Sequence, residues 1–153
     1  MTLSPSGNTK SIGFTIYLAG GVKMYTVKEV SEILEMTEHT VRFYTDKGLV
    51  PSLKRDKNNN RFFDEKSIHW LKGAQNLRGC GMTIEAIKEY VDLCLQGDST
   101  IIERYEIILK QKEIMDAKLI DITQKAEYIS NKANNYEDII NHLVPDTSNP
   151  DKW

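Results

Sequence analysis

The chain has little of what enzymes, secreted proteins and membrane proteins depend on. It contains two cysteines in 153 residues, too few for a disulfide framework and typical of a reducing cytoplasm. The apolar run Ile12–Ala19 is too short to span a bilayer. There is no glycine-rich phosphate loop, no pair of residues at metal-ligand spacing and no nucleophile beside a recognisable base. We therefore expect no catalytic residue, no cofactor and no bound metal.

The most informative stretch contains two short helical patterns joined by a tight turn. The first begins at Thr26, an N-cap whose capping-box partner, Glu29, follows three residues later. The second begins at Thr37 and ends at Gly48, where a left-handed backbone is needed, and Pro51 prevents further helix. The apolar residues of the first pattern recur at helical spacing: Val27, Val30, Ile33 and Leu34. Two helices this close predict a helix-turn-helix, whose second helix enters the major groove of DNA.

A basic hairpin is predicted directly after these helices. Leu53, Phe62 and Phe63 have strand character, and the three asparagines at 58–60 tolerate the positive φ of a tight loop. Against one acidic residue, Asp56, the hairpin carries four basic residues: Lys54, Arg55, Lys57 and Arg61. An isolated basic hairpin is usually a solvated loop, but one that follows a helix-turn-helix is well placed to contact DNA phosphates.

Three short motifs occur together in this region. They are Arg42-Phe43-Tyr44, Gly48-Leu49, and Arg61 after Asn58-Asn59-Asn60. In this combination the segment resembles the DNA-binding domain of the MerR family of bacterial transcription regulators. One departure is Asn59-Asn60, where many members have a glycine followed by an aromatic residue, and this leaves the turn type of the hairpin open.

The resemblance extends through helices expected at Glu65–Arg78 and Ile84–Leu95. It implies a mainly α fold, in which a winged helix-turn-helix domain with a small β-hairpin wing covers residues 24–97. A long dimerisation helix, paired as an antiparallel coiled coil, is expected to follow. The charge distribution agrees, because Met24–Cys80 holds ten basic and eight acidic residues whereas Gly81–Trp153 holds eight and fourteen.

The expected DNA contacts lie on the second helix and the hairpin. Base edges are within reach of the helix N-terminus, whereas Arg42, Tyr44 and Arg61 are expected to contact phosphates. The full set of expected DNA-binding residues is Thr37, Glu38, His39, Thr40, Arg42, Phe43, Tyr44, Lys54, Arg55, Lys57 and Arg61.

A heptad pattern covers residues 98–143. One set of residues stands seven apart: Ile101, Ile108, Met115, Ile122, Ile129, Tyr136 and Leu143. The companion position holds Tyr105, Leu119, Ala126, Ala133 and Ile140, with Lys112 as the exception. One helix alone cannot bury so long a seam, so the pattern predicts a coiled-coil homodimer. The alternative is a helix folded back on its own domain. The heptads alone leave the orientation open, and the antiparallel pairing is what the resemblance implies.

The two ends of the chain do not join these patterns. We expect residues 1–23 to be a disordered extension that arises from an upstream start or a cloning artefact. Their weak similarity to a signal peptide, with Lys10 before the apolar run and Ala19-Gly20 after it, does not fit an intracellular DNA binder. We expect residues 144–153 to be a frayed tail, and the chain after Leu143 is too short for a separate ligand domain.

Family members sense effectors, so the thiols need an interpretation. Metal-sensing members have cysteines at the start of the dimer helix and in a loop after it, whereas here Ser99 begins that helix and no cysteine follows Cys94. The branch that this chain resembles most senses aldehydes or other electrophiles through a cysteine in the third helix, and Asn76 stands there instead. Cys80, one helical turn away, is a candidate thiol sensor, with an incidental thiol as the alternative.

A small organic effector is the preferred signal. Residues that would supply apolar surface with one polar handle are Trp70, Ala74, Leu77 and Tyr105. The alternative is that these residues are plain core.

The sequence therefore predicts a cytoplasmic, homodimeric transcription regulator that binds promoter DNA. The resemblance implies that it acts at an overlong promoter spacer and distorts the DNA, so that RNA polymerase meets realigned promoter elements. The alternative is a winged-helix architectural or excision factor of a mobile element, although such factors usually lack a long dimer helix.

Overall fold

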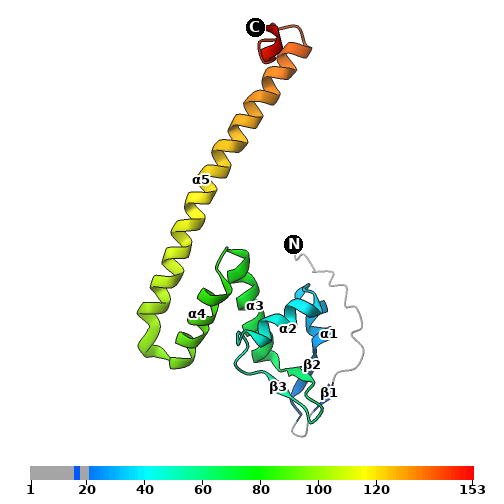
Figure 1. Ribbon diagram of the computed structural model, residues 1–153, viewed down its shortest axis with the longest axis vertical. Helices are drawn as coiled ribbons and strands as arrows, with labels where there is room; N and C mark the ends of the chain where they lie inside the picture. The colour runs from blue at the N-terminus through cyan, green and yellow to red at the C-terminus, as the bar shows by residue number, and fades with distance from the viewer. Residues whose placement is uncertain (1–15, 18–20) are drawn as a thin grey trace, which may run out of the picture. The chain divides into compact units, whose positions relative to one another are not determined.

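The computed structural model describes residues 16–17 and 21–153, and Figure 1 shows its elements. The helices are α1 (Val27–Leu34), α2 (Glu38–Asp46), α3 (Glu65–Gly79), α4 (Ile84–Gln96) and α5 (Ile101–Ile140), with short 3-10 turns at Asp98–Thr100 and Pro150–Lys152. The strands are β1 (Ile16–Tyr17), β2 (Lys23–Thr26), β3 (Lys54–Arg55) and β4 (Arg61–Phe63). The chain forms two compact units, one up to Arg104 and one from Tyr105 to Trp153.

The first four helices all begin at a side-chain cap. Thr26 and Glu29 form the predicted capping box, with the Glu29 amide 3.2 Å from Thr26 Oγ1 and the Thr26 amide 2.8 Å from Glu29 Oε2. Thr37 caps α2 as predicted. Asp64 caps α3 and Thr83 caps α4 in the same way. The boundaries of these helices are therefore set by local hydrogen bonds to otherwise unpaired amides.

The sheet fixes the hairpin wing against the helix-turn-helix. Strand β4 pairs with β3 on one side and with β2 on the other, both antiparallel, and Tyr25 stands opposite Phe63. Phe63, Leu49 and Val41 are fully buried, which places one core beneath the two helices and the wing. The prediction of a mainly α, winged helix-turn-helix fold with a long C-terminal helix is confirmed.

Most of the predicted N-terminal extension, residues 1–15 and 18–20, lies outside the described residues. Strand β1 falls within the same range and pairs with β2, with Ile16 opposite Met24 and Tyr17 opposite Lys23. The prediction that residues 1–23 are a disordered extension stays a prediction.

Gly48 ends α2 in the left-handed conformation that the sequence predicts, with φ at +74°. A Cβ atom added there would lie 2.8 Å from Cε of Lys88, the movable end of a flexible side chain. We expect Gly48→Ala to destabilise the protein by about 1 kcal/mol, because left-handed backbone costs an L-residue roughly 1–2 kcal/mol. Denaturant unfolding measures the change.

Gly73→Ala is the matched control for this prediction. Gly73 lies inside α3, and a Cβ atom there would meet nothing within 4 Å. Alanine should therefore stabilise the helix by about 0.8–1 kcal/mol. If both substitutions stabilised the protein, the left-handed turn at Gly48 would not be a requirement of the fold.

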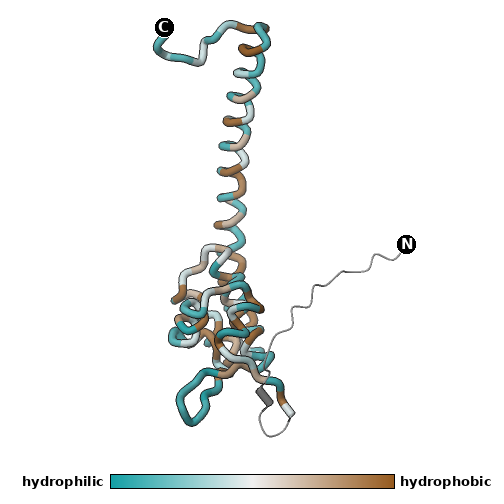
Figure 2. Tube along the Cα trace, turned by 90° about the vertical axis from the view of Figure 1, so that its right-hand side faces the viewer, coloured by the Kyte–Doolittle hydropathy of each residue, from teal (hydrophilic) through white to brown (hydrophobic). Residues whose placement is uncertain are grey.

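The helix α5 carries the predicted heptads on an open face. Figure 2 shows apolar residues recurring along the long helix, and within the described chain no residue of α5 is buried. The exposed seam residues include Ile101, Tyr105, Ile108, Leu119, Ile122, Ile129, Tyr136 and Ile140. In a single chain, the apolar side chains of this seam are therefore largely exposed to solvent.

The C-terminal segment folds back on α5, where the sequence predicted a frayed tail. Asn135 Nδ2 donates to Ser148 Oγ at 2.6 Å, and Lys152 lies 2.8 Å from Asp146. Trp153 Nε1 donates to the Thr147 carbonyl at 3.3 Å. Such side-chain bonds in a segment rich in Asp, Asn and Ser are typical of turns, and they give this end a defined course.

Candidate nucleic-acid interface

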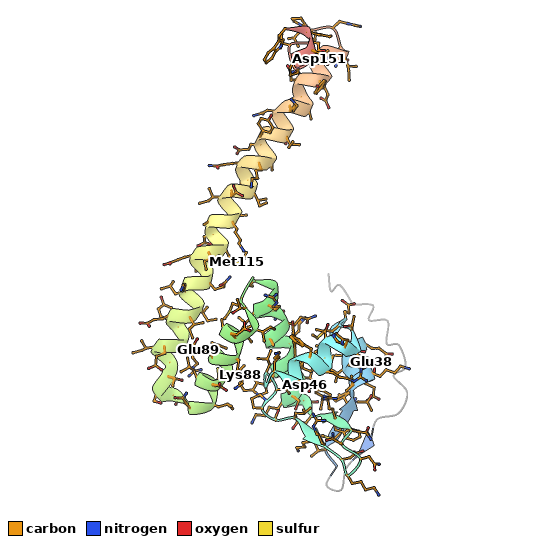
Figure 3. All side chains as sticks on the ribbon, in the orientation of Figure 1. Glu38, Asp46, Lys88, Glu89, Met115 and Asp151 are labelled. Atoms are coloured by element: carbon orange, nitrogen blue, oxygen red, sulfur yellow. The ribbon has the colours of Figure 1, made fainter. Side chains whose placement is uncertain are left out.

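Helix α2 has a buried face and an exposed face. Val41, Tyr44 and Thr45 are buried, whereas Glu38, His39, Arg42 and Phe43 are exposed. Figure 3 marks Glu38 at the start of α2 and Asp46 at its end. The exposed set is therefore the part of the predicted recognition helix that is open to a ligand.

Thr37 and Thr40 are tied to each other. Thr37 Oγ1 accepts from the Thr40 amide at 3.0 Å, and the two hydroxyls lie 2.8 Å apart. Their first role is to cap α2. Their predicted contact with bases stays a prediction. Glu38 and His39 are exposed at this end of the helix, and their side chains take no part in the cap.

Tyr44 is only 6 % exposed, so its first role is in the core. Its ring lies next to Phe43, with 6.2 Å between the ring centroids. Phe43 faces outward, and the ammonium of Lys47 lies 5.5 Å from the centre of its ring. The predicted phosphate contact of Tyr44 is untested, and its burial leaves little surface for it.

Arg42 is the basic residue in the middle of the exposed face. Its Nη2 lies 3.4 Å from Oε1 of Glu38, one turn earlier, and both side chains are about half exposed. Exposed ion pairs of this length contribute little free energy. Arg42 can therefore release Glu38 and bind a phosphate at a small cost in free energy.

The wing loop is organised by Asp56. Its Oδ1 accepts from the Asn58 and Asn60 amides at 2.8 and 2.9 Å, and its Oδ2 accepts from Asn60 Nδ2 at 3.0 Å. Asn59 takes the positive φ that the loop needs, 63°. In Figure 2 the hairpin appears as a hydrophilic loop. Asp56 is thus the acidic residue that shapes a basic loop.

These bonds, led by the one from the Asn60 side chain, hold the pKa of Asp56 below its ordinary value. A carboxyl with a depressed pKa stabilises the loop above its unfolded pKa and loses that effect as the pH falls through the folded pKa. We expect the Asn58 and Asn60 amide signals in NMR spectra to titrate with a midpoint below about 3.9, the reference value for aspartate. A midpoint at or above that value would contradict the hydrogen-bonded loop.

Arg61 joins the wing to helix α2. Its Nε donates to Thr45 Oγ1 at 3.0 Å and its Nη2 to Asp46 Oδ1 at 2.7 Å. The Arg61 side chain is only 19 % exposed, whereas that of Asp46 is 58 % exposed. The sequence predicted a phosphate contact for Arg61 and did not single out Thr45 or Asp46. No local sequence pattern predicts these two bonds, because Asp46 and Thr45 lie 15 and 16 residues before Arg61 in the chain.

A hollow lies between the wing, α2 and the start of α1. Its volume is about 380 Å³, and its lining residues are Thr26, Val27, Arg42, Asn59, Asn60, Arg61 and Phe62. It combines two guanidinium groups, asparagine side chains and the N-terminal end of a helix, where the macrodipole is positive. We call it the wing hollow. Its chemistry suits an anion such as a phosphodiester group.

The other predicted basic residues of the wing do not line this hollow. Lys54 is exposed, and its Nζ lies 4.0 Å from a carboxylate oxygen of Asp64, which is largely covered. Arg55 Nη1 donates to the Asn59 carbonyl at 3.2 Å. Lys57 is exposed in the loop. The wing therefore presents Lys54, Arg55 and Lys57 to solvent, whereas Arg61 is largely covered.

The predicted effector residues are not brought together within one unit. Ala74 is buried in α3, and Leu77 is half-buried on the same helix. Trp70 instead lines a hollow of about 320 Å³ with Lys66 and His69. Tyr105 belongs to the second unit. Cys80 is exposed at the end of α3 and forms no disulfide. The effector pocket and the thiol sensor stay predictions.

A helix-turn-helix with a basic wing, and a hollow lined by arginine and asparagine side chains between them, defines a winged helix-turn-helix DNA-binding protein. A family model, the MerR HTH family regulatory protein, matches residues 25–94. An HTH-type transcriptional regulator of Haemophilus influenzae is 29 % identical over 113 residues, covering 74 % of this chain and 84 % of that protein. The regulator AdhR of Bacillus subtilis is 32 % identical over 87 residues, covering 57 % and 62 %.

Solved structures give the same result. The chain is similar to HiNmlR, a MerR family regulator lacking the sensor domain, in its crystal structure bound to promoter DNA. The TM-score is 0.67 at 28 % identity, over 76 % of this chain and 92 % of that one. The chain belongs to the MerR family of transcription regulators, and it is a DNA-binding regulator, not an enzyme. Among the described residues, no helix is both long and apolar enough to cross a membrane.

Proposed function

We propose that the protein is a homodimeric regulator that binds promoter DNA in the cytoplasm and distorts the spacer between promoter elements, so that RNA polymerase can engage them. The observation that carries this proposal is the seam on α5. It runs through 40 residues of continuous helix, and its apolar side chains are not buried in the single chain. Seams of this length are buried by a second helix.

The sizes of the seam residues favour an antiparallel pair. The small residues Ala126 and Ala133 lie in the C-terminal half of α5, and their counterparts in the N-terminal half are large. In a parallel pair each alanine would face its own copy and leave a void, which is costly. In an antiparallel pair, Ala126 faces Met115 of the partner subunit and Ala133 faces Ile108 of the partner subunit. In each of these two layers of the coiled coil, a large side chain of one subunit then packs against an alanine of the other.

The same alignment pairs the two copies of α5 along their whole length. It sets Ile101 against Ile140 of the partner subunit, and Leu119 against Ile122 of the partner subunit. A shift of one heptad in either direction would leave Ile101 or Ile140 without an opposing residue on α5. This alignment is therefore the register we propose, and a symmetric pair of this kind sets the separation of the two recognition helices.

The DNA contacts we propose follow the geometry of the first unit. Arg42 and the wing hollow take a backbone phosphate, Glu38 and His39 face base edges, and Lys57 reaches a flanking phosphate. Arg61 acts mainly as a positioning residue, because Asp46 already neutralises much of its charge. HiNmlR, the similar regulator, is bound to promoter DNA in its structure, and this supports a promoter as the ligand here.

The proposal is tested by footprinting on the promoters next to the protein's own gene, followed by transcription with purified RNA polymerase. We expect protection across a promoter spacer, with a site of enhanced cleavage where the DNA is distorted. Shortening the spacer by a base pair or two should abolish the dependence of transcription on the protein while the footprint remains. Dependence that is unchanged on the shortened promoter would contradict spacer distortion.

The wing gives a second, independent prediction. Lys57→Ala should weaken binding to every sequence alike and lower the salt slope by about 0.9, the value for one phosphate contact. Arg61→Ala should weaken binding with a smaller change in slope, because it loosens the wing and removes a charge that Asp46 already offsets. Titrations at several salt concentrations measure both. If Arg61→Ala changed the slope as much as Lys57→Ala, Arg61 would be a direct phosphate ligand.

A further inference from the structure

The C-terminal segment has an ordered course but leaves its large apolar side chains in solvent. Trp153 is 85 % exposed and Leu143 is 71 % exposed, and Val144 next to it is also exposed. The bond between Ser148 and Asn135 nevertheless joins the segment to α5, and the bonds made by Lys152 and Trp153 fold the segment on itself. Ordering a segment costs conformational entropy, and exposed apolar clusters usually mark contact surfaces.

A second exposed apolar pair lies at the other end of α5. Leu95, at the end of α4, is 59 % exposed, and Ile102, in the first turn of α5, is 73 % exposed. Both residues belong to the first unit, where Thr100 Oγ1 donates to the Leu93 carbonyl at 2.6 Å and so ties the connection to α4. Ile102 is outside the heptad seam, so pairing of the two helices alone does not account for it.

We propose that Leu143, Val144 and Trp153 of one subunit form a clasp that covers Leu95 and Ile102 of the partner subunit. This inference rests on the proposed antiparallel dimer. In that register Ile140 lies opposite Ile101 of the partner subunit, so Leu143, three residues on, passes the start of the partner's helix. That is the level at which the partner's α4 ends. Twofold symmetry then produces two equivalent clasps in each dimer.

A second copy of the chain is the occupant that the register favours. A clasp made by the tips alone, Trp153 against Trp153 of the partner subunit, would require parallel helices. Parallel helices would set the alanines of α5 against each other. The clasp extends the proposed seam without a gap and gives the exposed Ile102 a partner.

Trp153 itself reports on the clasp. The chain has two tryptophans, so Trp70→Phe leaves Trp153 as the single fluorophore. In the dimer we expect blue-shifted emission and protection from iodide quenching. In the monomeric Ile108→Lys, Ile122→Lys background, we expect emission and quenching typical of an exposed indole. If Trp70→Phe disturbs the fold, the intact chain labelled with 5-fluorotryptophan gives the same comparison by ¹⁹F NMR, with Trp153→Phe assigning the resonance.

The partner's side is tested by Leu95→Glu. It should expose Trp153 to iodide while sedimentation still detects a dimer. A dimer in which Trp153 is fully quenchable would overturn the clasp and leave the proposed dimer intact. So would a dimer in which Trp153 stays protected despite Leu95→Glu. The absence of any dimer in the wild-type chain would instead overturn the proposed function on which the clasp depends.

The strength of the clasp is measured by Trp153→Ala. Burying a large apolar side chain contributes at least about tenfold to an equilibrium constant, and the dimer has two clasps. We therefore expect the dimer dissociation constant to rise about a hundredfold. Asp151→Ala, at an exposed position of the same segment, should change the constant by less than about fivefold. Equal effects of the two substitutions would overturn the assignment.

Discussion

Replacing Ile108 and Ile122 with lysine is expected to convert the protein into a monomer that binds its operator at least about a hundredfold more weakly. Each lysine would place an unpaired charge in an apolar seam, at a cost of about 3–5 kcal/mol. A monomer also reads only one half-site, so it loses the contribution of the second recognition helix. Sedimentation gives the oligomeric state, and a mobility-shift titration gives the affinity.

Ala117→Lys with Gln124→Lys is the matched control. Both positions are exposed on α5 and lie outside the heptad seam, and the pair adds the same charge. This variant should stay dimeric and bind DNA at least as well as the parent chain. A seam variant that stayed dimeric would place the interface elsewhere, whereas a control variant that became monomeric would show that added charge alone breaks the pair.

Arg42→Glu is expected to lower DNA affinity by about tenfold to a hundredfold for all sequences. Arg42 lines the wing hollow and is bound only by a long, exposed contact with Glu38. The substitution removes the proposed charge-assisted hydrogen bond to a phosphate, about 1.5–3 kcal/mol, and sets a carboxylate against the DNA backbone. The salt slope should fall by about one unit or more.

Lys72→Glu is the control, because Lys72 lies on α3 and does not line the wing hollow. It makes the same change in net charge and should have a much smaller effect on affinity. Similar losses from the two variants would mean that net charge, and not the hollow, governs binding. A loss of preference at one base pair, with non-specific binding retained, would make Arg42 a base reader.

The sequence by itself determined the elements whose causes are local. The capping box at Thr26, the cap at Thr37 and the left-handed Gly48 each depend on residues within one turn, so their spacing is enough to place helix ends. The heptads of α5 are equally local, since a periodic stripe is a property of one helix. The basic hairpin was also readable, because turn-forming asparagines stand between strand residues.

Only the tertiary structure decided which of the candidate DNA residues are open to a ligand. Tyr44 and Arg61 belong to the same motif set, yet Tyr44 packs into the core and Arg61 bonds to Thr45 and Asp46. The wing hollow brings together residues from Thr26 to Phe62. Contacts at this separation depend on how strand β4 pairs and how α2 packs, and no short-range pattern records them. The C-terminal fold-back is similar, because the bond that joins it to α5 links Ser148 to Asn135, 13 residues earlier in the chain.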